Sequence, residues 1–308
     1  MRILITEFMD EPAIAELRGR FQVVYDPTLV DRRDQMLALL KDCTGLIVRN
    51  RTQVDGAALA AAPRLRVVGR LGVGLDNIDT EACAARDIKV IPATGANAQA
   101  VAEYVITMAL VLLRGAYGVT ADVAAGRWPR TALSEGREIA DKTLGLIGFG
   151  SIGRRVASLA YAVGMRVIAH DPLIPAADRI WRDAGIERRE LDDVLAESDI
   201  ISLHIPLTDG TRGLIGAAQL QRMKRGSILV NTARGGIVDE AALAAVLMEK
   251  HLAGAAVDVF DREPLPAGSP LAGVPNLILT PHVAGLTAES NARVSRMIAS
   301  RVASTLQA

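Results

Sequence analysis

The chain has 308 residues, of which 50% are hydrophobic but only 3% are aromatic, so any core must consist mainly of Ala, Val, Leu and Ile. A core of this kind favours sheets covered by helices over an aromatic-rich β-sandwich. Lys and Arg total 35, as do Asp and Glu, and this lack of net charge argues against nucleic acid or an anionic membrane as a partner.

The N-terminal residues MRILITEFMDE indicate a strand followed by an acidic turn and lack the pattern of a signal peptide. The longest apolar run, residues 105–113, is too short to span a bilayer. Cys43 and Cys83 fit neither a disulfide framework nor a metal-ligand spacing, so we expect two buried thiols and no metal. The sequence therefore predicts a soluble, cytoplasmic protein.

Short β-branched runs alternate with helical patterns along most of the chain. The first series has predicted strands at residues 3–6, 23–25, 46–48, 67–68 and 90–91, with helices at 31–41 and 54–62. A long Ala/Val/Leu-rich helix at residues 98–117 separates it from the second series. That series has predicted strands at residues 143–147, 166–169, 200–203, 228–231, 255–257 and 277–279, and a last helix at 287–306.

Repeated βα units of this kind predict an α/β protein with parallel sheets and helices on both faces. The last helix has no strand after it and is expected to return to the first domain. The expected domains are therefore residues 1–97 with 285–308, and residues 98–284.

The segment that follows the predicted strand 143–147 has the sequence GFGSIG and opens a predicted helix. In such a loop Gly148 permits a tight turn, Gly150 lets the backbone approach a pyrophosphate, and Gly153 lets the helix pack on the strand. The helix N-terminus would offer its free N–H groups to the phosphates. We expect dinucleotide contacts along the whole loop: Gly148, Phe149, Gly150, Ser151, Ile152 and Gly153.

An acidic residue closes the next predicted strand. Asp171 stands where a carboxylate would bind the adenosine ribose hydroxyls. The alternative is a glycine turn with a helix-capping Asp, which the strand–helix–strand context disfavours. Because Asp171 would repel a 2′-phosphate, NAD is expected in preference to NADP. His170 is interpreted as a solvent-exposed neighbour.

Three candidate catalytic residues follow predicted strands of the second series, namely Arg234, Glu263 and His282. Ligands of open α/β sheets bind at the carboxyl ends of the strands. A guanidinium can grip a carboxylate with two hydrogen bonds, and a carboxylate-paired imidazole can exchange a proton near neutral pH. Taken singly, a surface Arg or a structural His is the commoner role. The pattern does not establish that Glu263 and His282 touch.

Several separate motifs together resemble the D-isomer-specific 2-hydroxyacid dehydrogenase family, over nearly the whole chain. Residues 69–79 (GRLGVGLDNID) are similar to its substrate-carboxylate loop, and residues 100–104 (AVAEY) to the start of its interdomain helix. Residues 231–239 (NTARGGIVD) and the pair Pro281-His282 are similar to its catalytic segments. The resemblance implies two Rossmann-like domains, the first substrate-binding and the second NAD-binding, with the active site in the interdomain cleft. It also implies a homodimer.

Residue by residue, the resemblance implies a catalytic triad. Arg234 would hold the substrate carboxylate and polarise the C2 carbonyl of a 2-oxo acid. His282 would exchange the proton on the C2 oxygen, and Glu263 would stabilise the imidazolium. Gly72, Val73 and Gly74 would add to the carboxylate site.

The resemblance also implies further contacts with NAD(H), from His204, Pro206, Thr211, Thr232, Ala233, Asp258 and His282. Asp258 is expected at the nicotinamide carboxamide and Pro206 near the adenine. His204 is interpreted as structural and not catalytic.

The loop after the predicted strand 46–48 carries Arg49 and Arg51, and resembles the substrate loop of some phosphoglycerate dehydrogenases. Two cations there suggest a substrate with a second anionic group at C3, of the 3-phosphoglycerate or 3-sulfolactate type. The alternatives are surface arginines or plain carboxylate binding, with glycerate/hydroxypyruvate or lactate-like acids as substrates.

Two other functions belong to proteins of similar fold. An NAD-sensing corepressor can retain the triad, but no charged or peptide-docking extension is evident here. A formate dehydrogenase is disfavoured because that subgroup carries Gln where Glu263 stands. The chain also stops at Ala308 without the C-terminal regulatory domain of longer phosphoglycerate dehydrogenases, so feedback control by an amino acid is not expected.

Overall fold

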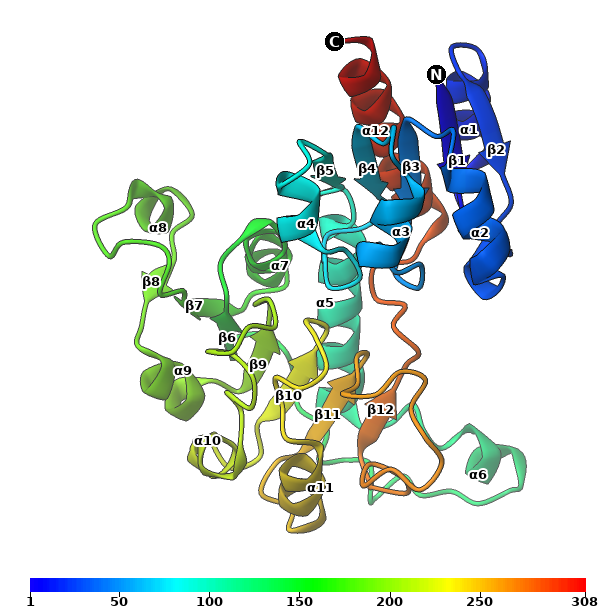
Figure 1. Ribbon diagram of the computed structural model, residues 1–308. Helices are drawn as coiled ribbons and strands as arrows, with labels where there is room; N and C mark the ends of the chain where they lie inside the picture. The colour runs from blue at the N-terminus through cyan, green and yellow to red at the C-terminus, as the bar shows by residue number, and fades with distance from the viewer. The chain divides into compact units, whose positions relative to one another are not determined.

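The computed structural model describes residues 1–308, which divide into two compact units (Figure 1). Unit 1 comprises Met1–Asn97 with Leu286–Ala308, and unit 2 comprises Ala98–Gly285. The bounds expected from the sequence differ from these by one residue, at the second boundary. Each unit is an α/β structure with one fully parallel sheet, as the alternating pattern predicts.

Unit 1 holds a five-stranded sheet with the order β2-β1-β3-β4-β5. Its strands are β1 (Arg2–Ile5), β2 (Gln22–Tyr25), β3 (Gly45–Val48), β4 (Val67–Arg70) and β5 (Lys89–Pro92). Its helices are α1 (Glu11–Arg18), α2 (Arg33–Leu40), α3 (Gly56–Ala61), α4 (Thr80–Ala84) and α12 (Ala288–Gln307), with a 3-10 turn at Leu29–Asp31.

Helices cover both faces of this sheet. One face packs on apolar residues of α1 and α12, and the other on apolar residues of α2, α3 and α4. Gly69 in β4 allows α12 to lie directly on the strand, because a Cβ there would stand 2.6 Å from Ile298 and 2.7 Å from Val302. The C-terminal helix thus completes the core of unit 1.

Unit 2 holds a seven-stranded sheet with the order β12-β11-β10-β9-β6-β7-β8. Its strands are β6 (Thr143–Ile147), β7 (Arg166–His170), β8 (Glu187–Arg188), β9 (Ile200–Leu203), β10 (Ile228–Asn231), β11 (Gly254–Val257) and β12 (Leu277–Leu279). Its helices are α5 (Ala98–Arg114), α6 (Thr120–Ala124), α7 (Ser151–Ala162), α8 (Arg179–Asp183), α9 (Leu191–Glu197), α10 (Ala217–Arg222) and α11 (Glu240–Met248).

The two faces of this sheet also have separate cores. Helices α5 and α7 pack side by side and cover one face, with Trp181 of α8 joining them (Figure 1). Helices α9, α10 and α11 cover the other face. Strand residues alternate between the two cores, since successive side chains of a strand point to opposite faces. The buried strands therefore read as continuous apolar runs in the sequence.

Apart from shifts of one or two residues at element ends, the structure differs from the expected elements in three places. Strand β8 was not predicted, because it has two charged residues and joins the sheet only through pairing with Ile168 and Ala169. Helix α2 begins at Arg33, after the 3-10 turn. Helix α5 ends at Arg114, just before Gly115 with a φ of +64°. None of the helices is both long and apolar enough to cross a membrane.

Candidate active site

The glycine-rich loop between β6 and α7 has the geometry expected of a phosphate-binding turn. Gly148 has a φ of +97°, and a Cβ there would lie 2.4 Å from the carbonyl oxygen of His204. A Cβ on Gly153 would lie 2.4 Å from the carbonyl oxygen of Gly148, so only glycine lets α7 start this close to the strand. Around Gly150, by contrast, no atom lies within 4 Å of such a Cβ. That open side is where a diphosphate would approach the backbone.

Helix α7 begins with Gly150 as its N-cap and has no side-chain cap, so the N–H groups of its first turn are available to an anion. Phe149 within the loop is fully buried and stacks on Trp181, with 5.1 Å between the ring centres. The side chain of Phe149 therefore belongs to the core, so the expected cofactor contact of Phe149 would come from its backbone.

Asp171 lies just beyond β7 and also shapes the glycine-rich loop. Its Oδ2 accepts a hydrogen bond of 2.8 Å from the N–H of Phe149, and its Oδ1 accepts one of 3.0 Å from Leu173. The carboxylate thus stands beside the loop, where an adenosine ribose would bind. The expectation for His170 was wrong: its side chain is only 15% exposed, and its Nδ1 lies 3.1 Å from the carbonyl oxygen of Arg189.

Other residues expected at the cofactor lie at the ends of neighbouring strands. The hydroxyl oxygen of Thr232, after β10, is buried and has no hydrogen-bond partner in the chain. A buried orphan of this kind fits a ligand that supplies the missing partner. The adjacent Ala233 is buried. Pro206 is exposed, and the hydroxyl of Thr211 donates to its carbonyl oxygen over 2.7 Å, which closes the turn after β9.

His204 has a structural environment. Its Nε2 lies 2.9 Å from the hydroxyl of Ser202, and its N–H donates to the carbonyl oxygen of Ile147 over 2.7 Å. Burial lowers the pKa of His204 to about 3, so the ring is neutral at physiological pH. These contacts agree with the structural role expected for it.

Glu263 and His282 are brought together at the carboxyl ends of β11 and β12. Oε2 of Glu263 lies 2.8 Å from Nδ1 of His282, and the two side chains are 34% and 37% exposed. Oε1 of Glu263 accepts a hydrogen bond of 3.1 Å from the N–H of Phe260. The carboxylate is thus held by its own loop while it orients the imidazole, which leaves Nε2 of His282 for a substrate.

Arg234 lies in the next loop of the same sheet edge, after β10. Its Nη1 donates to the carbonyl oxygen of Ala233 over 2.7 Å. The turn beneath it is fixed by Asn231, which is buried, accepts from the N–H of Ala233 and donates to the carbonyl oxygen of Arg234. Strands β10, β11 and β12 are consecutive in the sheet, so all three expected catalytic residues stand at one edge.

Gly235 couples the loop of Arg234 to the loop of Glu263. A Cβ on Gly235 would lie 1.8 Å from the carbonyl oxygen of Phe260 and 2.5 Å from the backbone nitrogen of Asp261. The two backbones therefore meet at a distance that no other residue permits. In the sequence this glycine is indistinguishable from an ordinary turn residue, which is why its role was not anticipated.

The turn that carries His282 is tied to the end of β11. Asp258 is only 1% exposed. Its carboxylate accepts hydrogen bonds from the Thr280 hydroxyl (2.5 Å) and from the N–H groups of Val283 and Ala284 (both 2.8 Å). Any contact with a nicotinamide carboxamide would have to share these oxygens. Asp258 thus also holds the turn Thr280–Ala284, a role that the sequence did not indicate.

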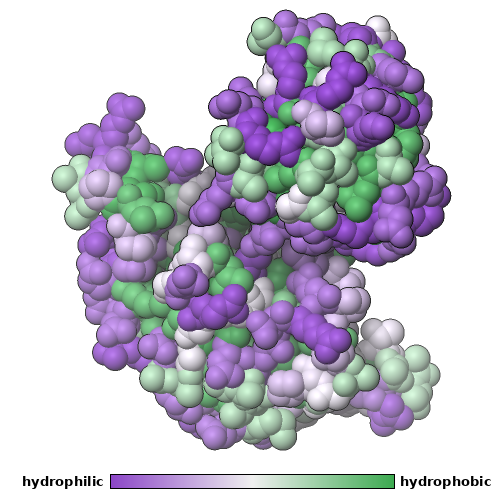
Figure 2. All heavy atoms as spheres, viewed as in Figure 1, coloured by the Kyte–Doolittle hydropathy of each residue, from purple (hydrophilic) through white to green (hydrophobic).

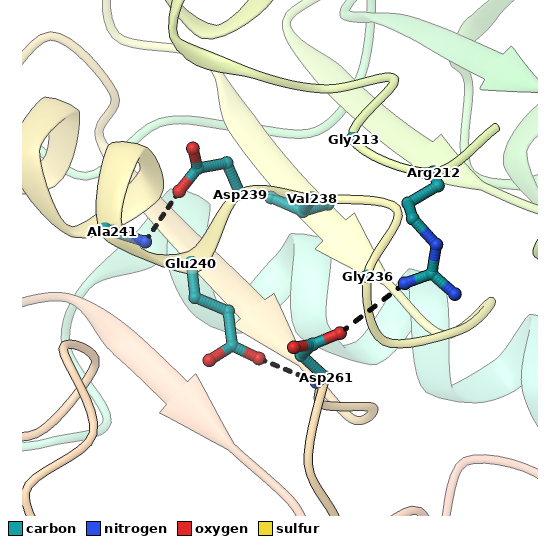
Figure 3. A pocket seen from close by; sticks show the side chains of 8 residues that line it. All are labelled: Arg212, Gly213, Gly236, Val238, Asp239, Glu240, Ala241 and Asp261. Carbon is teal, nitrogen blue, oxygen red and sulfur yellow. Dashed lines mark hydrogen bonds and ion pairs between the residues drawn. The ribbon is translucent and has the colours of Figure 1, made fainter. Parts of the chain in front are cut away.

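A pocket of about 300 Å³ lies next to this edge, between the turn after β9 and the start of α11 (Figure 3). Figure 3 shows that its charged groups are satisfied locally: Asp239 caps α11, Glu240 accepts from the N–H of Asp261, and Asp261 pairs with Arg212. The N–H of Gly213 also donates to the carbonyl oxygen of Gly236 over 2.7 Å. These contacts hold the turn after β9, which contains Thr211, against the loop after β10, which contains Arg234.

In unit 1 the loop after β3 carries Arg49 and Arg51 on a backbone fixed by Glu7. Glu7 is 5% exposed. Its two carboxylate oxygens accept hydrogen bonds from the N–H groups of Arg49, Arg51 and Thr52. This buried carboxylate follows β1 and was interpreted from the sequence only as part of an acidic turn. The role of Glu7 could be recognised from the sequence only if β1 and β3 were known to be neighbouring strands.

The two arginines differ in their surroundings. Nη2 of Arg49 donates to Oδ1 of Asn291 over 2.8 Å, and its guanidinium lies 5.8 Å from the ring centre of Phe8. Burial lowers the pKa of Arg49, against the attraction of Glu7. Arg51 is exposed and pairs with Asp31, which is equally exposed. Arg49 is thus held in place, whereas Arg51 is a solvent-screened cation.

The expected carboxylate loop follows β4. Gly72 sits against Arg70, since a Cβ there would lie 1.6 Å from Nη1 of that buried guanidinium. The carbonyl oxygen of Gly72 accepts from Ala93, whereas Val73 and Gly74 are partly exposed. A partly exposed backbone turn of this kind can present N–H groups to a carboxylate.

Comparison with known proteins places these observations in context. The family model for the NAD binding domain of D-isomer specific 2-hydroxyacid dehydrogenases matches residues 106–284. The (S)-sulfolactate dehydrogenase of Chromohalobacter salexigens is 55% identical over 294 residues, which are 95% of this chain and 94% of that protein.

Two further relatives extend the comparison. The D-3-phosphoglycerate dehydrogenase of Mycobacterium bovis is 41% identical over 97% of this chain, but the match spans only 56% of that longer protein. Among solved structures, the TT0316 protein of Thermus thermophilus superposes with a TM-score of 0.87 at 33% identity, covering 100% of this chain and 97% of that one. The fold of the whole chain is thus shared with a solved structure over nearly its full length.

Proposed function

The chain belongs to the D-isomer specific 2-hydroxyacid dehydrogenase family, and on that premise we propose that it transfers a hydride between NAD(H) and C2 of a small 2-hydroxy or 2-oxo acid bearing a C3 anion. The observation that carries this proposal is the 2.8 Å contact between Glu263 and His282, at the sheet edge that also bears Arg234. A carboxylate-oriented imidazole beside a guanidinium supplies the proton and the charge that the reaction needs.

When bound, NAD(H) supplies the nicotinamide that takes up or gives the hydride. Arg234 binds the substrate carboxylate and faces the C2 oxygen as it becomes negative. In the reducing direction, Nε2 of His282 gives its proton to that oxygen, and Glu263 at Nδ1 stabilises the imidazolium beforehand. In the oxidising direction the same nitrogen takes the proton from the C2 hydroxyl.

For the substrate we propose an acid of the 3-sulfolactate type, with 3-phosphoglycerate as a related choice. The 55% identical relative is named an (S)-sulfolactate dehydrogenase, and Arg49 and Arg51 supply cations for a second anionic group. Gly72, Val73 and Gly74 would bind the carboxylate of the same acid. Glycerate, hydroxypyruvate and lactate-like acids, which lack the C3 anion, are the alternative substrates.

A panel of acids with and without a C3 anion tests this proposal, followed by NADH absorbance. Arg49→Ala should raise KM for sulfolactate about tenfold or more and leave KM for lactate nearly unchanged, because a hydrogen bond to a charged group is worth about 1.5–3 kcal/mol. Arg51→Ala should have a smaller effect, since Asp31 already pairs with that side chain. Arg32→Ala, a salt-bridged surface arginine of the same unit, is the matched control. If Arg49→Ala changed KM equally for acids with and without a C3 anion, the proposal that these arginines bind a C3 anion would be wrong.

For the cofactor we propose a preference for NAD over NADP, set by Asp171. Asp171→Asn keeps an acceptor for the N–H of Phe149 but loses the charge and the acceptor for Leu173, so it should bind NAD less tightly than the wild type and use NADP better. Asp171→Ala loses the charge and both acceptors, and its Kd for NAD should rise about tenfold. Asp178→Asn, at the N-cap of α8, is the control for a capping carboxylate in the same unit. If Asp171→Asn keeps the wild-type ratio of kcat/KM for NAD and NADP, the ribose contact is not the source of selectivity.

We further propose a cytoplasmic homodimer. Helix α6 has no buried residue, and its segment exposes Tyr117, Val123 and Trp128, the last to 76%. The surface over α6 accordingly mixes hydrophobic with hydrophilic residues (Figure 2). A second copy of the chain would cover these side chains, and sedimentation equilibrium would then give twice the chain mass of 32.7 kDa.

A further inference from the structure

His282 has a backbone conformation that residues other than glycine rarely adopt. Its φ is +56°, in the left-handed region, and its N–H donates to the carbonyl oxygen of Thr280 over 3.0 Å, around Pro281. A conformation of this kind persists only where the surrounding contacts hold it. The position of the imidazole therefore depends on what fixes the turn Thr280–Ala284, and not on Glu263 alone.

The turn is held from beneath by a directed chain of hydrogen bonds. Thr280 has one hydroxyl proton, which it donates to Oδ1 of Asp258 over 2.5 Å. The hydroxyl of Tyr104 lies 2.6 Å from the same Thr280 oxygen, so Tyr104 must be the donor of that contact. The chain thus runs from Tyr104 through Thr280 to Asp258, which also accepts the N–H groups of Val283 and Ala284 on the far side of His282.

Tyr104 connects these hydrogen bonds to an element that is remote in the sequence. Tyr104 belongs to α5, the long helix that packs against the sheet beneath β10 and β11, whereas Thr280 and Asp258 follow β12 and β11. Burial raises the pKa of the Tyr104 hydroxyl, so it keeps its proton and stays a donor over the whole working range of pH. One rigid helix thereby anchors the loop of the histidine.

We propose that Tyr104 and Thr280 are positioning residues for the reaction: with Asp258 they fix the left-handed turn that points the His282 imidazole at the C2 oxygen. Neither hydroxyl touches substrate or cofactor in this scheme. The inference rests on the proposed function, because it assigns His282 the proton transfer. It gives a part in catalysis to two residues for which the sequence indicated none.

Thr280→Val is the decisive variant, because it keeps the shape of the side chain and removes the hydroxyl that links Tyr104 to Asp258. We expect kcat for 2-oxo acid reduction to fall by roughly ten- to a hundredfold, the scale of a misplaced catalytic group, while Kd for NADH and KM for the acid change little. Thr280→Ser restores the hydroxyl and should restore kcat. Tyr104→Phe leaves Thr280 bonded to Asp258 and should cost less, about threefold to tenfold on the same scale.

Two controls separate positioning from general destabilisation. Tyr161→Phe removes a hydroxyl that donates to the carbonyl oxygen of Gly185, also in unit 2, and Thr44→Val removes a buried hydroxyl that donates to the carbonyl oxygen of Arg2. Both should keep wild-type kcat, whatever they do to the melting temperature. Wild-type kcat in Thr280→Val, or an equal loss in Thr280→Val and Thr280→Ser, would overturn the inference. If His282→Ala itself keeps its activity, the proposed function fails and not merely this addition to it.

Discussion

Replacing His282 with alanine should lower kcat by about a hundredfold or more, which is the contribution expected of a positioned general acid–base. The pair geometry gives the reason: Glu263 occupies Nδ1 of His282 at 2.8 Å, which leaves Nε2 as the atom for the proposed proton exchange, and alanine has no replacement for it. Binding of NADH, measured by fluorescence titration, should stay within about twofold of wild type, since the glycine-rich loop is untouched.

A second histidine of the same unit serves as the control for this variant. His251 contacts the carbonyl oxygen of Met223 through Nε2 at 2.9 Å, and it follows the helix end of α11, at the opposite ends of the strands from the catalytic loops. His251→Ala should therefore keep kcat. Undiminished turnover by His282→Ala would assign the proton transfer to another group.

Replacing Arg234 with alanine should reduce kcat/KM by about a hundred- to a thousandfold, the loss typical of removing one preorganised group from a developing oxyanion. Arg234→Lys keeps the positive charge but not the planar fork, and we expect it to recover only part of the loss. Steady-state kinetics on the same 2-oxo acid measure both variants. The ordering wild type, Lys, Ala is the signature of a group that both binds and polarises the substrate.

Arg222→Ala is the matched control, because Arg222 is a surface arginine of the same unit that pairs with Asp192. It should be indistinguishable from wild type. Were Arg234→Lys as active as wild type, charge alone would be sufficient, and the two-point grip on the carboxylate would be excluded. A rise in KM without any fall in kcat would instead limit Arg234 to ground-state binding.

The sequence predicted the two parallel sheets well because buried parallel strands leave a strong signal, a run of β-branched residues between helical patterns. It also placed Arg234, Glu263 and His282 correctly at strand ends. It could not supply the contact between Glu263 and His282, because the strands fix only which edge a loop leaves from. The distance between two side chains depends on the course of the loops, such as the left-handed turn at His282.

The residues that sequence reasoning missed share one property: each acts on a segment remote in the chain. Glu7 binds backbone groups more than forty residues away, and Tyr104 reaches a threonine 176 residues later. In one dimension Glu7 is part of an acidic turn and Tyr104 is one more residue on an apolar helix. Strand β8 was missed for a related reason, because a two-residue strand has no periodicity of its own.

The contact between Gly235 and the backbone of Phe260 fixes how far apart the loops of Arg234 and Glu263 lie. Because the two main chains are in contact there, the segment bearing the guanidinium and the segment bearing the carboxylate pack directly against each other. Their relative placement is then set by folding, before any substrate binds. The two charged groups are therefore preorganised, and binding of a substrate acid would not require the protein to rearrange them.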